Sequence, residues 1–176
     1  MINLNFNGDL PGGRTFDHKS QLIFPWYTKS FLTELTKWDI STWKVFEYGS
    51  GDSTIWWRRN CREVISVDTN YEWSQKTNSY FSDNKKDFIE FPLKFIDEEL
   101  FDCIIIDGDP VEWRDDCCEI SLKCLKKGGI IIADNYEQES INCLNWHKTN
   151  NFLLEKEKKV FIQQGHNDWK TCFWKI

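Results

Sequence analysis

Four apolar segments of the chain each end in an acidic residue, and this pattern constrains the fold more than any other feature of the sequence. The acids that close these segments are Glu47, Asp68, Asp107 and Asp134. Each segment is short and apolar, as expected of strands that helices bury on both faces. The four strands are predicted over 44–48, 63–68, 101–107 and 129–134. The carboxyl ends of parallel strands meet at one edge of a sheet, where open α/β folds bind their ligands. The four acids are therefore predicted to lie along one ligand-binding edge.

Segments with helical spacing of apolar residues separate these strands, and the alternation predicts a doubly wound, mostly parallel α/β sheet. Helices are predicted over 25–38, through 55–57, and over 72–81, 115–125 and 140–148. A weak strand is expected over 88–91. Two final strands, 159–164 and 170–176, flank a Gly-His-Asn-Asp turn and predict an antiparallel C-terminal hairpin.

The length of the chain predicts a single domain. Its 176 residues are enough for one well-buried core and few for two. Residues 1–23 are polar, contain the sequence Pro11-Gly12-Gly13, and are predicted to form an N-terminal arm before a domain over 24–176. The seven cysteines include no C-x-x-C pair, which favours reduced, buried thiols and a cytoplasmic location.

The charge balance disfavours nucleic acid as a partner. The formal net charge is −6, and no cluster of Lys and Arg stands out along the chain. The N-terminus lacks the pattern of a signal peptide, and no segment approaches the roughly 20 apolar residues that a membrane span needs. We therefore expect a soluble protein without a membrane partner. The sequence does not report the oligomeric state.

The first strand runs into a glycine turn that is typical of nucleotide-like cofactor sites. Gly49 and Gly51 let backbone N–H groups approach a ligand closely, and Ser53 or Thr54 is expected to cap the following helix. A dinucleotide fingerprint, G-x-G-x-x-G, would need glycine in place of Thr54. The acid Glu47 would also repel a pyrophosphate. An uncharged or cationic cofactor is favoured over NAD.

In its motifs the sequence resembles the class I S-adenosylmethionine-dependent methyltransferases. The matching segments are Glu47-x-Gly49-x-Gly51, Asp68 at 21 residues after Glu47, residues 102–108, residues 127–132 and the terminal hairpin. The resemblance implies a seven-stranded Rossmann-like sheet with S-adenosylmethionine at the glycine turn and its ribose at Asp68. The cofactor-binding candidates are Glu47, Gly49, Ser50, Gly51, Ser53 and Asp68.

The function that this resemblance implies is methyl transfer to a small-molecule or sugar-like acceptor, on oxygen or nitrogen. Asp107 and Asp109 are the catalytic candidates. Asp107 ends the third of the four apolar strands, and Asp109 lies two residues further on. Arg114, a little further on, could meet a polar or anionic substrate, although a surface ion pair is the commoner role. Trp26 could close over the cofactor or simply pack its helix onto the sheet.

Three oxygen-bearing residues at the strand ends are candidate ligands of a metal ion. Asp107, Asp134 and Asn135 are similar to the Mg²⁺ site of catechol-type O-methyltransferases, and their oxygens suit that ion. Those enzymes carry a catalytic Lys three residues after the first acid, where this chain has Pro110. Two interpretations stay open: a Mg²⁺ site, or an Asp107 that orients cofactor or substrate while Asp134 and Asn135 end a strand.

Two further functions fit the same fold, because a fold does not fix an activity. One is an aminopropyl-type transferase that uses a related adenosyl cofactor. The other is a cofactor-binding module without catalysis, which the Pro110 substitution favours. The sequence leaves the methyl acceptor unnamed.

Overall fold

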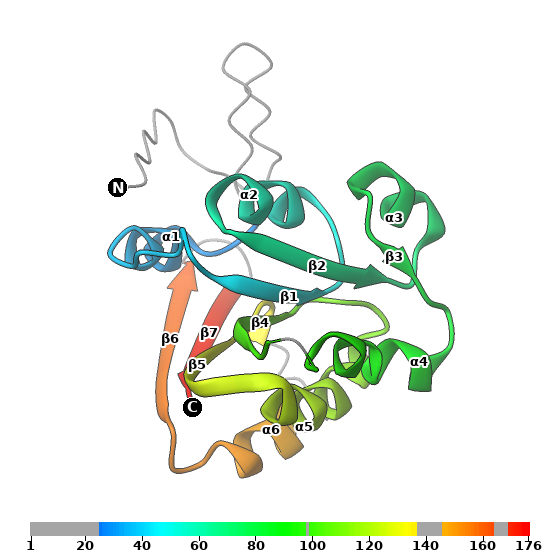
Figure 1. Cartoon of the computed structure of the whole chain (residues 1–176). Coiled ribbons are helices and arrows are strands. Elements are labelled where there is room, and N and C mark those ends of the chain that lie inside the picture. Colours follow the sequence, from blue (N-terminus) through cyan, green and yellow to red (C-terminus); the bar gives the residue numbers. More distant parts are fainter. Residues whose placement is uncertain (1–24, 98, 137–145, 164–168) are drawn as a thin grey trace.

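The computed structural model describes residues 25–97, 99–136, 146–163 and 169–176. Its strands are β1 (Lys44–Tyr48), β2 (Glu63–Asp68), β3 (Tyr80–Phe81), β4 (Phe101–Ile106), β5 (Leu125–Ala133), β6 (Glu157–Gln163) and β7 (Trp169–Lys175). Within the described residues they form a seven-stranded sheet of order β3-β2-β1-β4-β5-β7-β6 (Figure 1). β7 runs antiparallel to both of its neighbours, whereas the other pairs are parallel. The predicted doubly wound sheet with its C-terminal hairpin is confirmed.

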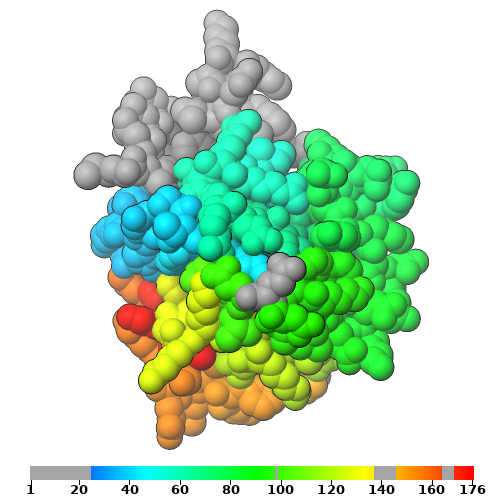
Figure 2. All heavy atoms as spheres, in the orientation of Figure 1, coloured from blue at the N-terminus to red at the C-terminus, as the bar shows by residue number. Residues whose placement is uncertain are grey.

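Helices cover both faces of this sheet (Figure 1). One face carries α1 (Lys29–Leu35), α2 (Asp52–Asn60) and α3 (Tyr71–Thr77), and the other carries α4 (Lys85–Ile89), η1 (Phe91–Phe95), η2 (Val111–Trp113), α5 (Arg114–Cys124) and α6 (His147–Phe152). In the space-filling view α1, in blue, lies beside α2, in cyan to teal, and the green segment from α3 to α4 follows on the other side of α2 (Figure 2).

The core has two halves because successive side chains of a strand point to opposite faces. In β4, Cys103 and Ile105 belong to the cluster under α1 and α2, whereas Ile104 and Ile106 belong to the cluster under α4 and α5. All four side chains are fully buried. A continuous apolar run therefore marks a strand that is packed on both sides.

The prediction of a strand over 88–91 is wrong, because this segment forms the end of α4 and the start of η1. The Asn84 side chain caps α4 by accepting a hydrogen bond from the Asp87 N–H at 3.1 Å. Phe88 and Ile89 are buried on one side of this short helix. The helix predicted over 72–81 ends earlier than expected, at Thr77, and β3 takes its last two residues.

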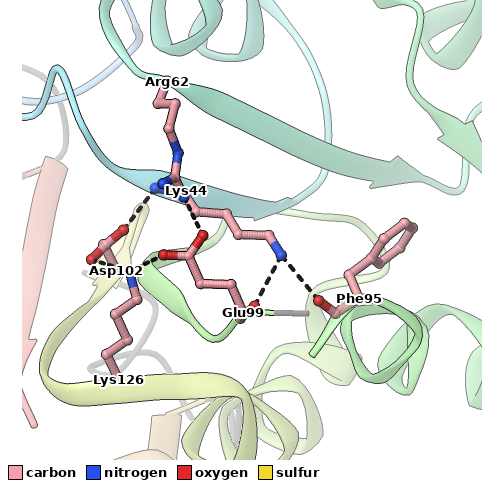
Figure 3. Close-up of polar contacts among 6 residues, drawn as sticks. All are labelled: Lys44, Arg62, Phe95, Glu99, Asp102 and Lys126. Carbon is pink, nitrogen blue, oxygen red and sulfur yellow. Dashed lines mark hydrogen bonds and ion pairs between the residues drawn. The ribbon is translucent and has the colours of Figure 1, made fainter. Parts of the chain in front are cut away.

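A polar network joins the amino-terminal ends of the strands, opposite the glycine turn (Figure 3). The buried Lys44 ammonium donates to the carbonyl oxygens of Phe95 at 3.0 Å and Glu99 at 2.9 Å, while its backbone N–H donates to Asp102 at 2.7 Å. Lys126 pairs with both Asp102 and Glu99. β5 begins at Leu125, directly after α5, whereas the sequence predicts a helix up to Leu125.

Some predictions fall on residues outside the described part of the chain. These are the N-terminal arm over 1–23, most of the helix over 140–148, and the hairpin turn over 165–168. In the part that is described, α6 begins at His147, whose side chain is exposed. No helix among the described residues has the length and apolar character to cross a membrane.

Candidate active site

The turn between β1 and α2 depends on glycine at one position in particular. Gly49 has a φ of +92°, which favours glycine, and its N–H donates to the carbonyl oxygen of Val67 at 2.8 Å. A Cβ on Gly49 would lie 3.0 Å from the carbonyl carbon and oxygen of Asp107. Gly51 is extended, and a Cβ there would meet open space. The turn therefore packs closely against the residue that follows β4 at Gly49, whereas it leaves free space beside Gly51.

The cap of α2 differs from the prediction. Gly51 is the N-cap residue, and Ser53 and Thr54 lie inside the first turn. The Gly51 N–H donates to Oγ1 of Thr54 at 2.9 Å, which satisfies a backbone donor at the start of the helix. The hydroxyls of Ser53 and Thr54 point back to the strand, where they donate to the two carboxyl oxygens of Glu47, each at 2.5 Å.

Glu47 is a buried support of the turn, with 1% of its surface exposed, and it does not line the adjacent cavity. Burial raises the pKa of its carboxyl group to about 8, against the lowering effect of the Ser53 and Thr54 hydrogen bonds. The raised pKa favours the protonated form of this group near neutral pH. The prediction that Glu47 presents a negative charge to the ligand needs revision, because this carboxyl group is buried and does not line the cavity.

Asp68, which the sequence proposes as the ribose-binding acid, ends β2. Its carboxylate accepts hydrogen bonds from the Ser50 hydroxyl and the Asn70 N–H, each at 2.7 Å. Next to it, the Thr69 hydroxyl donates to the carbonyl oxygen of Asp109 at 2.7 Å. These bonds connect the loops that follow β1, β2 and β4 around one space.

That space is a cavity of about 510 Å³, within the range of small-molecule and cofactor sites. Its lining residues are Trp26, Gly49, Ser50, Gly51, Asp52, Ser53, Asp68, Thr69, Asn70, Trp73, Asp107, Gly108 and Asp109. Sequence reasoning selected most of the turn, the three acids after β2 and β4, and Trp26. It missed Asp52, Thr69, Asn70, Trp73 and Gly108, although three of these, Asp52, Thr69 and Gly108, directly adjoin a predicted residue.

Arg114 is a buried structural residue, contrary to both roles that the sequence suggests for it. Only 4% of its surface is exposed. Its guanidinium donates to the carbonyl oxygens of Gly108 at 2.9 Å, Asp134 at 2.9 Å and Asp107 at 3.3 Å, and it lies 3.6 Å from the Asp107 carboxylate. Arg114 thus holds the carboxyl ends of β4 and β5 together and is not available to an anionic substrate.

The structure lends no support to the predicted Mg²⁺ site. Asp134 is buried, and its two carboxylate oxygens accept hydrogen bonds from the Thr171 hydroxyl at 2.8 Å and the Trp169 indole N–H at 3.3 Å. Asp134 does not line the cavity that Asp107 borders. Among the residues that the structure describes, no group of three or more His, Cys, Asp or Glu side chains could hold a metal ion. Asn135, at a φ of +53°, follows directly after Asp134.

The described cysteines add no reactive group to the site. Six of them are free thiols, and all but Cys61 are buried. Burial raises the pKa of Cys61 and Cys118 to about 12 and that of Cys124 to about 11. Burial also holds the pKa of Cys103 and of Cys117 well above the ordinary value of a thiol. Thiols of this kind are inert, because the thiolate is the nucleophile.

Comparison with known proteins identifies the fold. No protein-family model and no curated protein sequence matches the chain. Solved structures do match, among them an O-methyltransferase from Bacillus cereus in complex with S-adenosylhomocysteine, at 20% identity and a TM-score of 0.60 over 83% of this chain and 79% of that one. The N-methyltransferase NodS from Bradyrhizobium japonicum matches at 15% identity and a TM-score of 0.56 over 84% and 94%.

A third match is a protein from Clostridium thermocellum that carries a provisional assignment as an rRNA methylase. It is 16% identical, with a TM-score of 0.60 over 87% of this chain and 98% of that one. Together these likenesses show that the protein has the class I S-adenosylmethionine-dependent methyltransferase fold. The names of these three proteins point to different kinds of methyl acceptor. The comparison therefore leaves the acceptor of this chain open.

Proposed function

We propose that the protein transfers a methyl group from S-adenosylmethionine to a small-molecule acceptor. The observation that carries the proposal is the cavity, which combines the glycine turn after β1, the carboxylate of Asp68 after β2 and the Asp107-Gly108 backbone after β4. Ligands of open α/β folds bind at this edge. Two of the structural neighbours, the Bacillus cereus enzyme and NodS, were solved with S-adenosylhomocysteine.

The residues present fit this cofactor. Asp68 offers carboxylate oxygens to ribose hydroxyls in exchange for its present bonds to Ser50 and Asn70. The open space at Gly51 lets the backbone approach the methionine part. When bound, S-adenosylmethionine supplies an already activated methyl group, so that the protein mainly has to position the acceptor and exclude water. Among the lining residues, Trp26 and Asp109 are exposed, which puts them where the cavity opens to solvent.

Calorimetry with S-adenosylhomocysteine tests the binding part of the proposal. We expect the wild-type protein to bind it, and the Gly51→Trp variant to lose binding because the indole would enter the open space beside Gly51. Glu155→Trp is the control for an added indole, since Glu155 is exposed and does not line the cavity. Wild-type protein that fails to bind at millimolar concentration would sink the proposal.

Two other functions remain as outcomes of a turnover assay. Transfer of an aminopropyl group from decarboxylated S-adenosylmethionine, with no methyl transfer, would make the protein an aminopropyl transferase. Binding without turnover on a broad acceptor panel would favour a non-catalytic cofactor-binding module. Nucleic-acid acceptors belong in the panel, but the chain's net charge of −6 favours small molecules.

A further inference from the structure

The described lining of the cavity carries four carboxylates and no basic side chain. Asp52, Asp68, Asp107 and Asp109 border the space, whereas no Lys, Arg or His among the described residues does. Arg114, the basic residue closest to them in sequence, is buried and directs its donors to backbone carbonyls. A cavity lined by one sign of charge concentrates ligands of the opposite sign. An anionic acceptor would find no charged partner here.

Three of the four carboxylates already have compensation. Asp68 accepts two hydrogen bonds from Ser50 and Asn70. Asp107 lies 3.6 Å from the Arg114 guanidinium. Asp52 lies in the first turn of α2, where the partial positive charge of the helix N-terminus favours an acid.

Asp109 is different. Its carbonyl oxygen accepts the hydrogen bond from Thr69, but its exposed carboxylate has no partner among the residues that the structure describes. Bound S-adenosylmethionine would carry one net positive charge and so would not offset all four acids. One carboxylate at the cavity mouth is therefore left for a second, positively charged ligand.

The indole ring of Trp26 also borders this cavity. Trp26 lines it and is 50% exposed, and its indole has no ring partner among the described residues. The other indole of the lining, Trp73, already has the Lys76 ammonium 4.2 Å from its ring centroid. Tryptophan is the best of the aromatic side chains at attracting a cation to its ring face. Trp26 thus offers a cation-binding surface that no described residue uses.

From these features we infer that the methyl acceptor is a cationic amine, held at the cavity mouth by the carboxylate of Asp109 and the indole of Trp26. The inference rests on the proposed function, because it names the acceptor of that same site. In the transfer, an amine that has lost a proton to water attacks the methyl carbon. The carbon–sulfur bond breaks with its electron pair left on sulfur, and a methylated amine and S-adenosylhomocysteine result.

The test first measures the binding of S-adenosylhomocysteine, and then the binding of acceptor probes to the protein loaded with it. A failure of the cofactor site is thereby distinguished from a failure of the acceptor site. The probes form two sets, each with an amine, an alcohol and a carboxylate of similar size. The first set is phenethylamine, 2-phenylethanol and phenylacetate, and the second is butylamine, butanol and butyrate. Each probe is titrated by calorimetry or ligand-observed NMR. We expect each amine to bind at least about tenfold more tightly than its alcohol, as a charge-assisted contact provides. The carboxylates should not bind.

Variants assign the effect to the two residues. Asp109→Asn should weaken the amines about tenfold, with a smaller effect on the alcohols and on S-adenosylhomocysteine. Trp26→Leu should weaken the amines, and Trp26→Phe should restore most of the loss because a phenyl ring also attracts cations. Asp97→Asn is the control, an exposed aspartate outside the cavity lining.

The inference is overturned if the carboxylates bind as tightly as the amines, if none of the probes binds to the loaded protein, or if the preference for amines survives Asp109→Asn in full. Any of these results, with S-adenosylhomocysteine still bound, leaves the proposed methyltransferase function standing.

Discussion

The backbone of Asp107 fills the space that a side chain at Gly49 would need. A Cβ on Gly49 would be 3.0 Å from both the carbonyl carbon and the carbonyl oxygen of Asp107, closer than ordinary van der Waals contact. The N–H of Asp107 in turn donates to the carbonyl oxygen of Tyr48 at 3.0 Å. The glycine turn after β1 and the acid after β4 therefore form one packed unit.

Gly49→Ala should destabilise the protein more than Gly128→Ala. Both glycines have positive φ, at +92° and +82°, and an alanine there costs about 1–2 kcal/mol from conformation alone. At Gly128 a Cβ meets open space, whereas at Gly49 it meets the Asp107 backbone. We expect the Gly49 variant to lose at least about 1 kcal/mol more in the free energy of unfolding, measured by urea denaturation. Equal losses would show that the close approach to Asp107 carries no energetic weight.

Glu47→Gln should gain stability relative to the wild type as the pH rises. The folded protein keeps the Glu47 proton up to a pKa of about 8, whereas the unfolded chain releases it near the ordinary value of 4.5. Above pH 4.5 the unfolded state of the wild type is therefore favoured progressively, and the stability that protonated Glu47 contributes is lost as the pH rises to about 8. A glutamine cannot titrate.

The measurement is the difference in unfolding free energy between variant and wild type at several pH values. It should shift in favour of Glu47→Gln by up to about 1.4 kcal/mol for each pH unit between 4.5 and 8. Effects of other titrating groups cancel in this difference. The Ser53 hydroxyl can accept a hydrogen bond from the glutamine amide, which keeps the contact. A difference that does not change with pH would mean that Glu47 is ionised in the folded protein.

Arg114→Met should be among the most destabilising single changes at the site. It leaves the carbonyl oxygens of Gly108 and Asp134 without the guanidinium that they now bind. Removing one member of a buried charged cluster costs about 3–5 kcal/mol. Lys123→Met is the control on the same helix, because Lys123 is exposed and makes only a 3.7 Å pair with Glu119. Thermal unfolding of both variants decides the point, and a small loss for Arg114→Met would refute the role assigned to Arg114.

Asp134→Ala should act on stability and leave cofactor affinity within about threefold of the wild type. The change removes the acceptor of the Thr171 hydroxyl, and Thr171 itself accepts from the Thr28 N–H at 3.0 Å. We expect a loss of about 1–3 kcal/mol in unfolding free energy, with a smaller loss for Asp134→Asn, which keeps an acceptor oxygen. A Mg²⁺-dependent rise in melting temperature that Asp134→Ala abolishes would instead establish Asp134 as a metal ligand.

The sequence predicts best those parts of the fold in which burial dictates the residue type. β1 and β2 have the predicted bounds, because both consist of short apolar runs that end in a turn. β3 was missed, since its two residues, Tyr80 and Phe81, are too few for any periodicity. The false strand over 88–91 arose because a short buried helix and a short buried strand present the same apolar run.

In the site, sequence reasoning found positions and missed orientations. Of the four acids at the strand ends, Asp68 and Asp107 border the cavity, whereas Glu47 and Asp134 do not. The direction of the Glu47 carboxyl could not be deduced, because it depends on hydroxyls that lie one helical turn beyond the glycines. Likewise, nothing in the local sequence shows that Arg114 turns inward, since the carbonyl oxygens that it binds come from two separate strands.

The bonds from Ser53 and Thr54 to Glu47 have a consequence for the kinetics of cofactor capture. They fix the start of α2 to the end of β1, so the glycine turn between them is held at both ends before any ligand arrives. A loop that is already ordered spends little conformational entropy on binding. Association should then follow single-exponential kinetics in stopped-flow mixing, with an observed rate that increases linearly with cofactor concentration. This is the behaviour of one-step binding to a site that does not rearrange.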